Sequence, residues 1–143
     1  MAGGAVNPIL NTGLLIGVLC ALWMLVCGVT GWYKDPTLNL LFFLVIPIEI
    51  GGLVWGLRQT AREGRNYSQQ IVAGTMMAVI AGVVIVVASL AFTAMFPDAM
   101  DAPRAADPSA TPMSQALAGF IGTLVTGILA SAAIAIAVRA PRR

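Results

Sequence analysis

A single acidic residue interrupts an otherwise uncharged apolar stretch of this chain. Glu49 is the only charged residue between Leu38 and Leu57. It lies about eleven residues into that stretch, which in a helix is close to the middle of a lipid bilayer. An ionised carboxylate at that depth costs at least about 3 kcal/mol. We therefore expect Glu49 to be protonated, to be hydrogen-bonded or to face a hydrated cavity.

Pro47 lies two residues before Glu49, and Gly51 and Gly52 follow it. A proline inside a helix removes one hydrogen bond and frees the carbonyl four residues back, here that of Phe43. The pattern predicts a kink with a free carbonyl beside a carboxyl group. Such a site can bind a proton or a cation.

The partners of Glu49 can be predicted from helix rise. None of the other apolar stretches contains Lys or Arg, so an intramembrane ion pair within one chain is excluded. Residues at a similar depth are Thr126 and Ser131 in the last stretch and Trp23 in the first. Two interpretations stay open. The single acid favours a neutral, hydrogen-bonded packing group, because transport sites usually recruit several polar groups; the alternative is a proton or cation site.

The composition of the chain is that of a membrane protein and not of a water-soluble domain. Of 143 residues, 59% are hydrophobic and 10% are charged, whereas soluble domains carry about 25% charged residues. There is no histidine, which excludes His-ligated metals and haem and a Ser-His-Asp triad. Cys20 and Cys27, seven residues apart, are expected to be packing residues on one helix face. We expect no catalytic residue, no metal or other cofactor, and no nucleic-acid partner.

Four stretches are long enough to cross a membrane as helices, over about residues 9–29, 38–57, 71–95 and 116–138. Every backbone polar group in hydrocarbon must be paired internally, so these stretches should be helical. The fold class predicted is an all-α, integral membrane bundle of four transmembrane helices, forming one membrane domain over residues 1–143. The loop 96–114 holds four prolines and is predicted to be extended and weakly ordered.

Basic residues predict the orientation. With four spans, one side of the membrane holds six arginines and the other holds Lys34 and Arg104. The bias places both termini and the loop between the second and third spans in the cytoplasm. The excess of arginine over lysine and the high alanine content are associated with GC-rich bacterial genomes, so the membrane expected is a bacterial inner membrane. The six are Arg58, Arg62, Arg65, Arg139, Arg142 and Arg143. The first three form a basic cluster that acts as a topology determinant, or that binds anionic lipid headgroups or an acidic partner.

Small residues recur at four-residue spacing in the predicted helices, where they allow close helix packing. We expect most of these faces to build the bundle itself. The stripe in the last helix is long enough to serve a homo-oligomer or a partner subunit as well. The main packing glycines are Gly13, Gly17, Gly52, Gly56, Gly119 and Gly127.

Two segments resemble a known family. Residues 62–74, REGRNYSQQIVAG, combine a basic loop containing glycine with a polar-aromatic turn, a glutamine and a glycine one turn into the next helix. Residues 7–17, NPILNTGLLIG, are also similar to the opening of this family. The family is a group of small four-helix bacterial membrane proteins known as domain of unknown function 4199. The resemblance implies four helices and no catalytic residues.

Two functional hypotheses follow. The first is a non-enzymatic membrane protein that acts as a structural or accessory subunit, packing its helices against a larger membrane complex. The alternative is a small oligomeric transporter or channel, coupled to a proton or cation through Glu49. Its size and single membrane acid resemble those of small multidrug transporters, although their acid lies in the first helix and this one lies in the second.

Overall fold

The computed structural model describes residues 7–138, which contain helices and no strand. Four segments are long and apolar enough to cross a membrane, namely α1, η2 with α2, α3 and α5. The predicted all-α bundle of four membrane-spanning helices is thus confirmed. Its α-helices and 3₁₀ helices (η) are, in chain order, α1 (Pro8–Thr30), η1 (Trp32–Lys34), η2 (Leu38–Leu44), α2 (Val45–Arg62), α3 (Tyr67–Met95), η3 (Pro97–Met100), α4 (Asp101–Ala106) and α5 (Pro112–Ala137).

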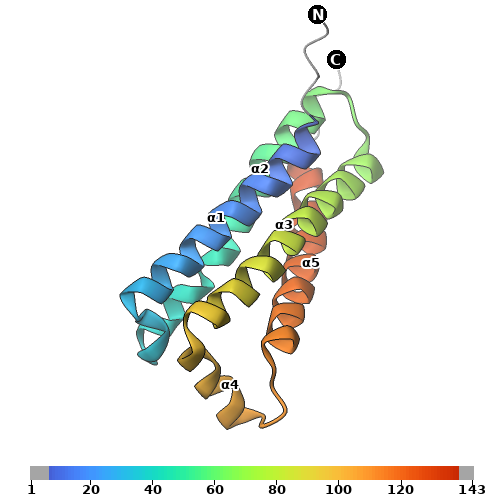
Figure 1. The fold of residues 1–143 in the computed structure, drawn as a ribbon. Coiled ribbons are helices and arrows are strands. Elements are labelled where there is room, and N and C mark those ends of the chain that lie inside the picture. The colour runs from blue at the N-terminus through green and yellow to red at the C-terminus, as the bar shows by residue number, and fades with distance from the viewer. Residues whose placement is uncertain (1–6, 139–143) are drawn as a thin grey trace, which may run out of the picture.

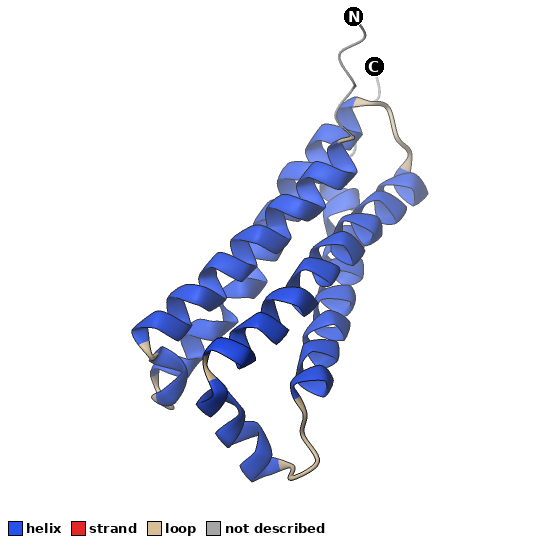
Figure 2. Cartoon of the chain, in the orientation of Figure 1, coloured by secondary structure: helices blue, strands red, loops and turns tan. Residues whose placement is uncertain are grey.

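The four long helices form a ring in the order α1, α2, α5, α3. Helix α3 packs most extensively against α5 and α1, and α2 closes the ring between α1 and α5 (Figure 1). The start of α1, the α2–α3 connection and the end of α5 lie at one end of the bundle, here named the α2–α3 end. The elements η1, η3 and α4 lie at the opposite end, named the α4 end (Figure 2).

Side-chain caps and glycine define where the helices begin and end. Asn7 caps α1, and Asn66 caps α3 in a capping box with Gln69. Thr111 caps α5 in the same way, together with the serine three residues later. Helix α1 ends at Gly31, whose φ of 72° lies in the left-handed region that favours glycine. The bounds of the spans are therefore encoded by local residues.

The second span differs from the prediction of one α-helix kinked at Pro47. Residues 38–44 form the 3₁₀ helix η2, and α2 begins only at Val45. Pro47 is therefore the third residue of α2, in the first turn, where a helix needs no N–H donor. The proline is exposed, whereas Glu49 is buried. Gly51 is also exposed and touches nothing within 4 Å, so neither residue belongs to a site with Glu49.

The prediction that the loop 96–114 is extended is wrong, because the loop contains two short helices, η3 and α4. Residue Pro97 opens η3, and Pro103 lies in the first turn of α4, where a missing N–H is tolerated. Asp98 and Asp101 lie in the first turns of these helices, where a negative charge is favourable. The prolines thus start helices here instead of preventing them.

Small residues bring the helices into close contact. A Cβ added to Gly13 would lie 2.7 Å from Ile80 Cβ, and one added to Gly17 would lie 2.6 Å from Val84 Cβ. Across α1 and α2, Gly56 lies against Thr12 and Gly52 lies against Ile16. These glycines are used within the bundle, as predicted.

The small-residue stripe of α5 also faces inward. Gly127 lies against Ala78, and Ser131 lies against Gly74. Thr123 and Ala135 are buried. Gly119 differs, because its nearest neighbour for an added Cβ is Ile85 at 3.9 Å. Of the five stripe residues, Thr123, Gly127, Ser131 and Ala135 are thus buried within the bundle, and Gly119 is exposed.

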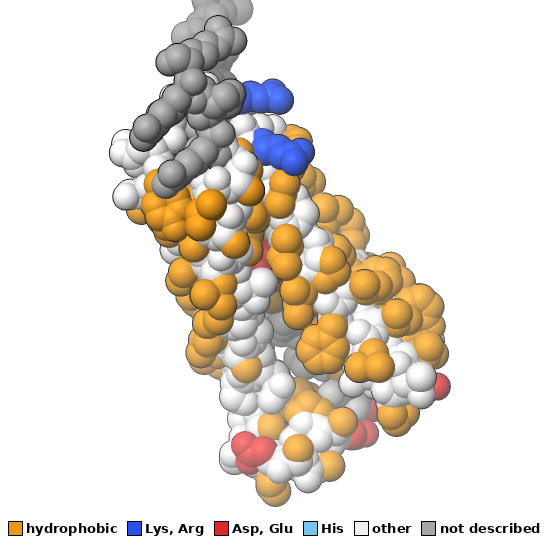
Figure 3. Space-filling model, turned by 180° about the vertical axis from the view of Figure 1, so that it is seen from behind, with side chains coloured by type: hydrophobic (Ala, Val, Ile, Leu, Met, Phe, Trp, Pro, Cys, Tyr) orange, Lys and Arg blue, Asp and Glu red, His pale blue; other side chains and the backbone are white. Residues whose placement is uncertain are grey.

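Large apolar side chains cover the outside of the bundle. Leu22, Val29, Val87, Leu129 and Ile136 are each more than half exposed. Orange apolar side chains dominate the middle of the face in Figure 3, with blue basic side chains at one end and most red acidic ones at the other. This distribution suits a molecule whose middle lies in hydrocarbon.

Candidate functional site

A cavity of about 420 Å³ lies among the helices in the half of the bundle toward the α4 end. A volume of this size is typical of small-molecule sites. Figure 3 shows the molecule hollowed toward the end that carries most acidic side chains. The lining is mainly apolar and aromatic, with hydroxyl and amide groups and no basic or acidic side chain. It comprises Cys20, Met24, Tyr33, Asn39, Phe42, Val45, Ile85, Ser89, Phe92, Thr93, Ala99, Met100, Ala102, Pro103, Gln115, Ala118, Gly119 and Thr123.

Glu49 lies at the contact between α2 and α5, on the side of the cavity that faces the α2–α3 end. Its side chain is buried, with 4% exposed, and its Oε1 has no hydrogen-bond partner among residues 7–138. A Cβ on Gly127 would lie 3.3 Å from that oxygen. The carboxyl group therefore occupies the space that the missing side chain of Gly127 leaves open.

The cavity and Glu49 are one helical turn apart. Val45 and Thr123 line the cavity, and each lies four residues before Glu49 and Gly127 on α2 and α5, respectively. Both helices run from the α4 end toward the α2–α3 end. The Glu49 carboxyl therefore lies about 6 Å further toward the α2–α3 end than Val45 and Thr123 do.

The groups facing Glu49 bear little charge. Helices α3 and α5 present Ala78 and Gly127 at this level. From α1 the thiol of Cys20 lies 3.9 Å from the carbonyl oxygen of Val45, which is one turn before Glu49 on α2. No group of three or more His, Cys, Asp or Glu residues that could hold a metal ion occurs within the described ranges.

None of the three predicted partners of Glu49 hydrogen-bonds to it. The indole N–H of Trp23 donates to the carbonyl oxygen of Leu41 at 2.9 Å, so its assignment to Glu49 is wrong. Thr126 is half-buried and makes no bond to the carboxyl. Ser131 is fully buried one turn beyond Gly127, and its hydroxyl faces Gly74 instead.

Three polar side chains contact one another at the α4 end, next to the cavity. Tyr33 Oη donates to Asp98 Oδ1 at 2.6 Å, and Lys34 Nζ lies 2.5 Å from Asp98 Oδ2. The hydrogen bond from Lys34, followed by that from Tyr33, holds the pKa of Asp98 below its ordinary value. The Tyr33 ring also packs edge-on against Phe92, with ring centroids 5.7 Å apart. This group, the Asp98 latch, joins η3 to η1.

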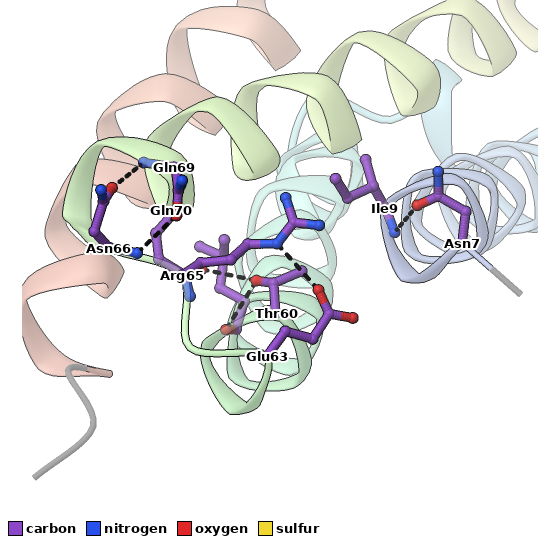
Figure 4. Close-up of polar contacts among 9 residues, drawn as sticks. Asn7, Ile9, Thr60, Glu63, Arg65, Asn66, Gln69 and Gln70 are labelled. Atoms are coloured by element: carbon purple, nitrogen blue, oxygen red, sulfur yellow. Dashed lines mark hydrogen bonds and ion pairs between the residues drawn. The ribbon is translucent and has the colours of Figure 1, made fainter. Parts of the chain in front are cut away.

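The predicted basic cluster lies at the α2–α3 end. Arg58 and Arg62 are exposed and lie one turn apart on α2. Arg65 follows Gly64 and its Nε donates to Glu63 Oε2 at 3.0 Å, so it does not continue the α2 face (Figure 4). The other three arginines of the orientation argument, Arg139, Arg142 and Arg143, lie outside the described residues.

The sequence analysis missed several buried polar groups. Two of them are Thr12 Oγ1 and Gln70 Nε2, which, like Glu49 Oε1 and the Oγ of the predicted residue Ser131, are buried without a hydrogen-bond partner in the described part of the chain. Thr60 Oγ1 donates to Gln70 Oε1 at 2.7 Å. Gln70 belongs to the polar start of α3, directly before the apolar run that begins at Ile71, so its position in the sequence did not indicate that it is buried.

Comparisons with known proteins identify the family of the chain. Neither the comparison with curated proteins nor that with solved structures found a match. Residues 11–106 match the family described as Protein of unknown function (DUF4199). Because this match spans more than half of the chain, the chain belongs to the DUF4199 family, as the resemblance of its two segments predicted.

Proposed function

We propose that this chain is a non-enzymatic membrane protein that exchanges a proton on Glu49 for a small lipophilic cation bound in the cavity. The observation that carries the proposal is the buried Glu49 carboxyl, which has no hydrogen-bond partner for its Oε1 among residues 7–138. It lies one helical turn from a cavity of about 420 Å³, toward the α2–α3 end. In hydrocarbon, an acidic group of this kind needs either a proton or a nearby positive charge. The cation and the proton therefore compete for the same carboxylate.

The cavity lining supports this class of solute. Phe42, Phe92 and Tyr33 provide aromatic rings that attract organic cations. Asn39 and Gln115 provide amide oxygens.

No acidic or basic side chain lines the cavity. Asp98, which bonds to the lining residue Tyr33, is already paired with Lys34. Glu49 is buried and its Oε1 has no hydrogen-bond partner among residues 7–138, so it is the proposed source of the compensating negative charge. A cation with an apolar body fits such a site better than a hydrated metal ion, which needs several oxygen ligands.

The accessory-subunit hypothesis has less support. It drew on the small size of the chain, on the absence of catalytic groups and on small-residue faces, of which the stripe in the last helix was expected to be long enough to serve a partner as well. Gly13, Gly17, Gly56 and Gly127 all contact side chains of the same bundle. The outer surface of the bundle carries large apolar side chains, which lipid tails can cover without a partner protein.

The proposed setting is the bacterial inner membrane with the α2–α3 end in the cytoplasm. The positive-inside rule supports this orientation, since Arg58 and Arg62 are exposed at that end. Anionic headgroups of the inner leaflet are their proposed partners, each contact contributing about 1 kcal/mol.

Binding of tetraphenylphosphonium to the purified protein in lipid nanodiscs tests the proposal. We expect binding to tighten as the pH rises, because fewer protons then compete for Glu49, and we expect about one proton to be released per cation bound. Glu49→Gln removes the titratable group at nearly constant volume and is expected to abolish both signals. Glu63→Gln, which changes an exposed carboxyl at the α2–α3 end, is the matched control and should bind as the wild type does.

Two results would contradict the proposal. The first is cation binding that is the same in the wild type and in Glu49→Gln, without proton release. The second is a Glu49→Gln protein without any defect while Glu49→Leu alters helix association, which would identify Glu49 as a packing group. Co-purification of a large partner in stoichiometric amount, together with either result, would favour the accessory-subunit hypothesis instead.

A further inference from the structure

The half of the bundle beyond Glu49 contains a line of buried polar groups that leads to the α2–α3 end. Glu49, Ser131 and Gln70 come from α2, α5 and α3, and each is at least nine-tenths buried. Each also has a polar atom without a hydrogen-bond partner in the described part of the chain. Buried polar atoms of this kind are normally satisfied, often by internal water.

The contacts set these groups in order. Glu49 Oε1 lies against Gly127 of α5, and Ser131 lies one turn further along the same helix. The Ser131 hydroxyl lies against Gly74 of α3, and Gln70 lies one turn from Gly74 toward the α2–α3 end. Each step advances by about one turn, or about 6 Å. One water molecule that bonds to both neighbours spans about 5.5 Å.

The line ends close to the helix connection at the α2–α3 end. Gln70 Oε1 accepts the hydroxyl proton of Thr60 at 2.7 Å, which leaves its amide nitrogen free to donate. Gln70 lies in the first turn of α3, directly after the capping box of Asn66 and Gln69. Figure 4 shows Thr60 and Gln70 beside this capping box and beside Arg65.

We propose that Ser131 and Gln70 form a proton relay, bridged by internal water, that connects Glu49 to the α2–α3 end. A proton that reaches the Ser131 hydroxyl is accepted on its oxygen while the proton already there moves on to the next water. Gln70 orients water by donating from its amide and does not change charge. The net step is the conversion of the Glu49 carboxylate into the carboxylic acid by one proton from that side.

This inference rests on the proposed function, and it adds a second access to Glu49. The cavity gives access from the α4 end, and the relay gives access from the opposite end. The groups that face Glu49 are the Cys20 thiol from α1, with Ala78 and Gly127 from α3 and α5, so no other acid or base of the described spans stands in the route.

The test measures which side of a membrane sets the protonation of Glu49. Dicyclohexylcarbodiimide modifies protonated carboxyl groups in apolar surroundings, and mass spectrometry measures its reaction at Glu49 in vesicles. The pH is set separately inside and outside. An impermeant amine reagent reports which side carries Lys34, the single lysine of the chain.

In the wild type, acidifying either side is expected to raise the labelling rate, by up to about tenfold per pH unit. With Ser131→Ala and Gln70→Met combined, labelling should keep its response on the Lys34 side and lose it on the other side. Thr126→Val is the matched control, because Thr126 is a half-buried hydroxyl residue of α5 that neither lines the cavity nor bonds to Glu49. That variant should keep the response on the α2–α3 side.

A wild type that responds on the Lys34 side alone would overturn the relay and leave the proposed function standing. A double variant that responds like the wild type on both sides would also overturn it. Labelling that ignores the pH on both sides would overturn the relay and the proposed function together. Circular dichroism and gel filtration of the double variant establish that it is folded when labelled.

Discussion

Glu49 and Gly127 face each other across the α2–α5 contact, and a Cβ on residue 127 would stand 3.3 Å from the carboxyl oxygen Oε1. The same added atom would collide with Ala78 Cβ on α3. Glycine at position 127 thus allows three helices to meet around one acidic side chain. This contact connects the small-residue pattern of α5 to Glu49, the only charged residue in the stretches 9–29, 38–57, 71–95 and 116–138 of the sequence.

Gly127→Ala is expected to destabilise the bundle by about 1–3 kcal/mol, because an extra methyl group in a packed interior forces side chains or backbone apart. It should also weaken tetraphenylphosphonium binding, since Glu49 must move. Thermal unfolding in detergent and the nanodisc binding assay measure the two effects. Gly122→Ala on the same helix is the control, because nothing lies within 4 Å of an added Cβ there. Equal melting temperatures for both variants would contradict the assigned contact.

The Asp98 latch is expected to open in acid. The hydrogen bonds from Lys34 and Tyr33 lower the pKa of Asp98 from its ordinary value of 3.8. A lowered pKa in the folded state means that the interaction is fully present above pH of about 4 and is lost as the pH falls through the lower value. Hydrogen exchange in η3 and α4, corrected for intrinsic rates, should therefore rise on acidification to pH of about 3.

The Asp98→Asn variant tests the latch at neutral pH. It removes the charge, and trypsin cleavage after Arg104 in α4 should become about two- to fivefold faster, as expected for an exposed ion pair. Glu63→Gln changes an exposed carboxyl at the α2–α3 end of the bundle and should leave the rate unchanged. Cleavage at the same rate in Asp98→Asn and wild type would show that the latch does not hold α4.

The orientation can be measured through Lys34. With the α4 end outside the cytoplasm, an impermeant amine reagent added to intact cells should label this lysine side chain, which is exposed. Peptide mass mapping locates the label, and Lys34→Arg removes it at constant charge. Labelling of Lys34 only after the cells are made permeable would reverse the proposed orientation.

Much of the fold could be predicted because its signals are local. An uncharged stretch of about twenty apolar residues must form a helix in hydrocarbon, since its backbone groups have no other partners. The cap of α3 is a signal of the same local kind, because Asn66 stands directly before the helix and its side chain bonds to the backbone three residues later. Counting residues also placed Glu49 near the middle of its span, which runs from Leu38 to Arg62.

The internal structure of the second span could not be predicted from the position of Pro47 alone. Its ring is tolerated in the first turn of a helix and disruptive in the middle. Which case holds depends on where α2 begins, and the 3₁₀ helix η2 moves that start to Val45. The side chain of Pro47 then points outward, away from the acidic residue that lies close to it in sequence.

The depth of each side chain follows from the order of residues, but its direction does not. Ser131, Trp23 and Thr126 were predicted to reach Glu49 because they lie at similar depth, yet Ser131 faces Gly74 and Trp23 bonds to Leu41. Each residue turns a helix by about 100°, so contact between helices depends on their rotation and register. Those are set by the packing of α1, α2, α3 and α5 together, and this packing creates both the cavity and the Glu49–Gly127 contact.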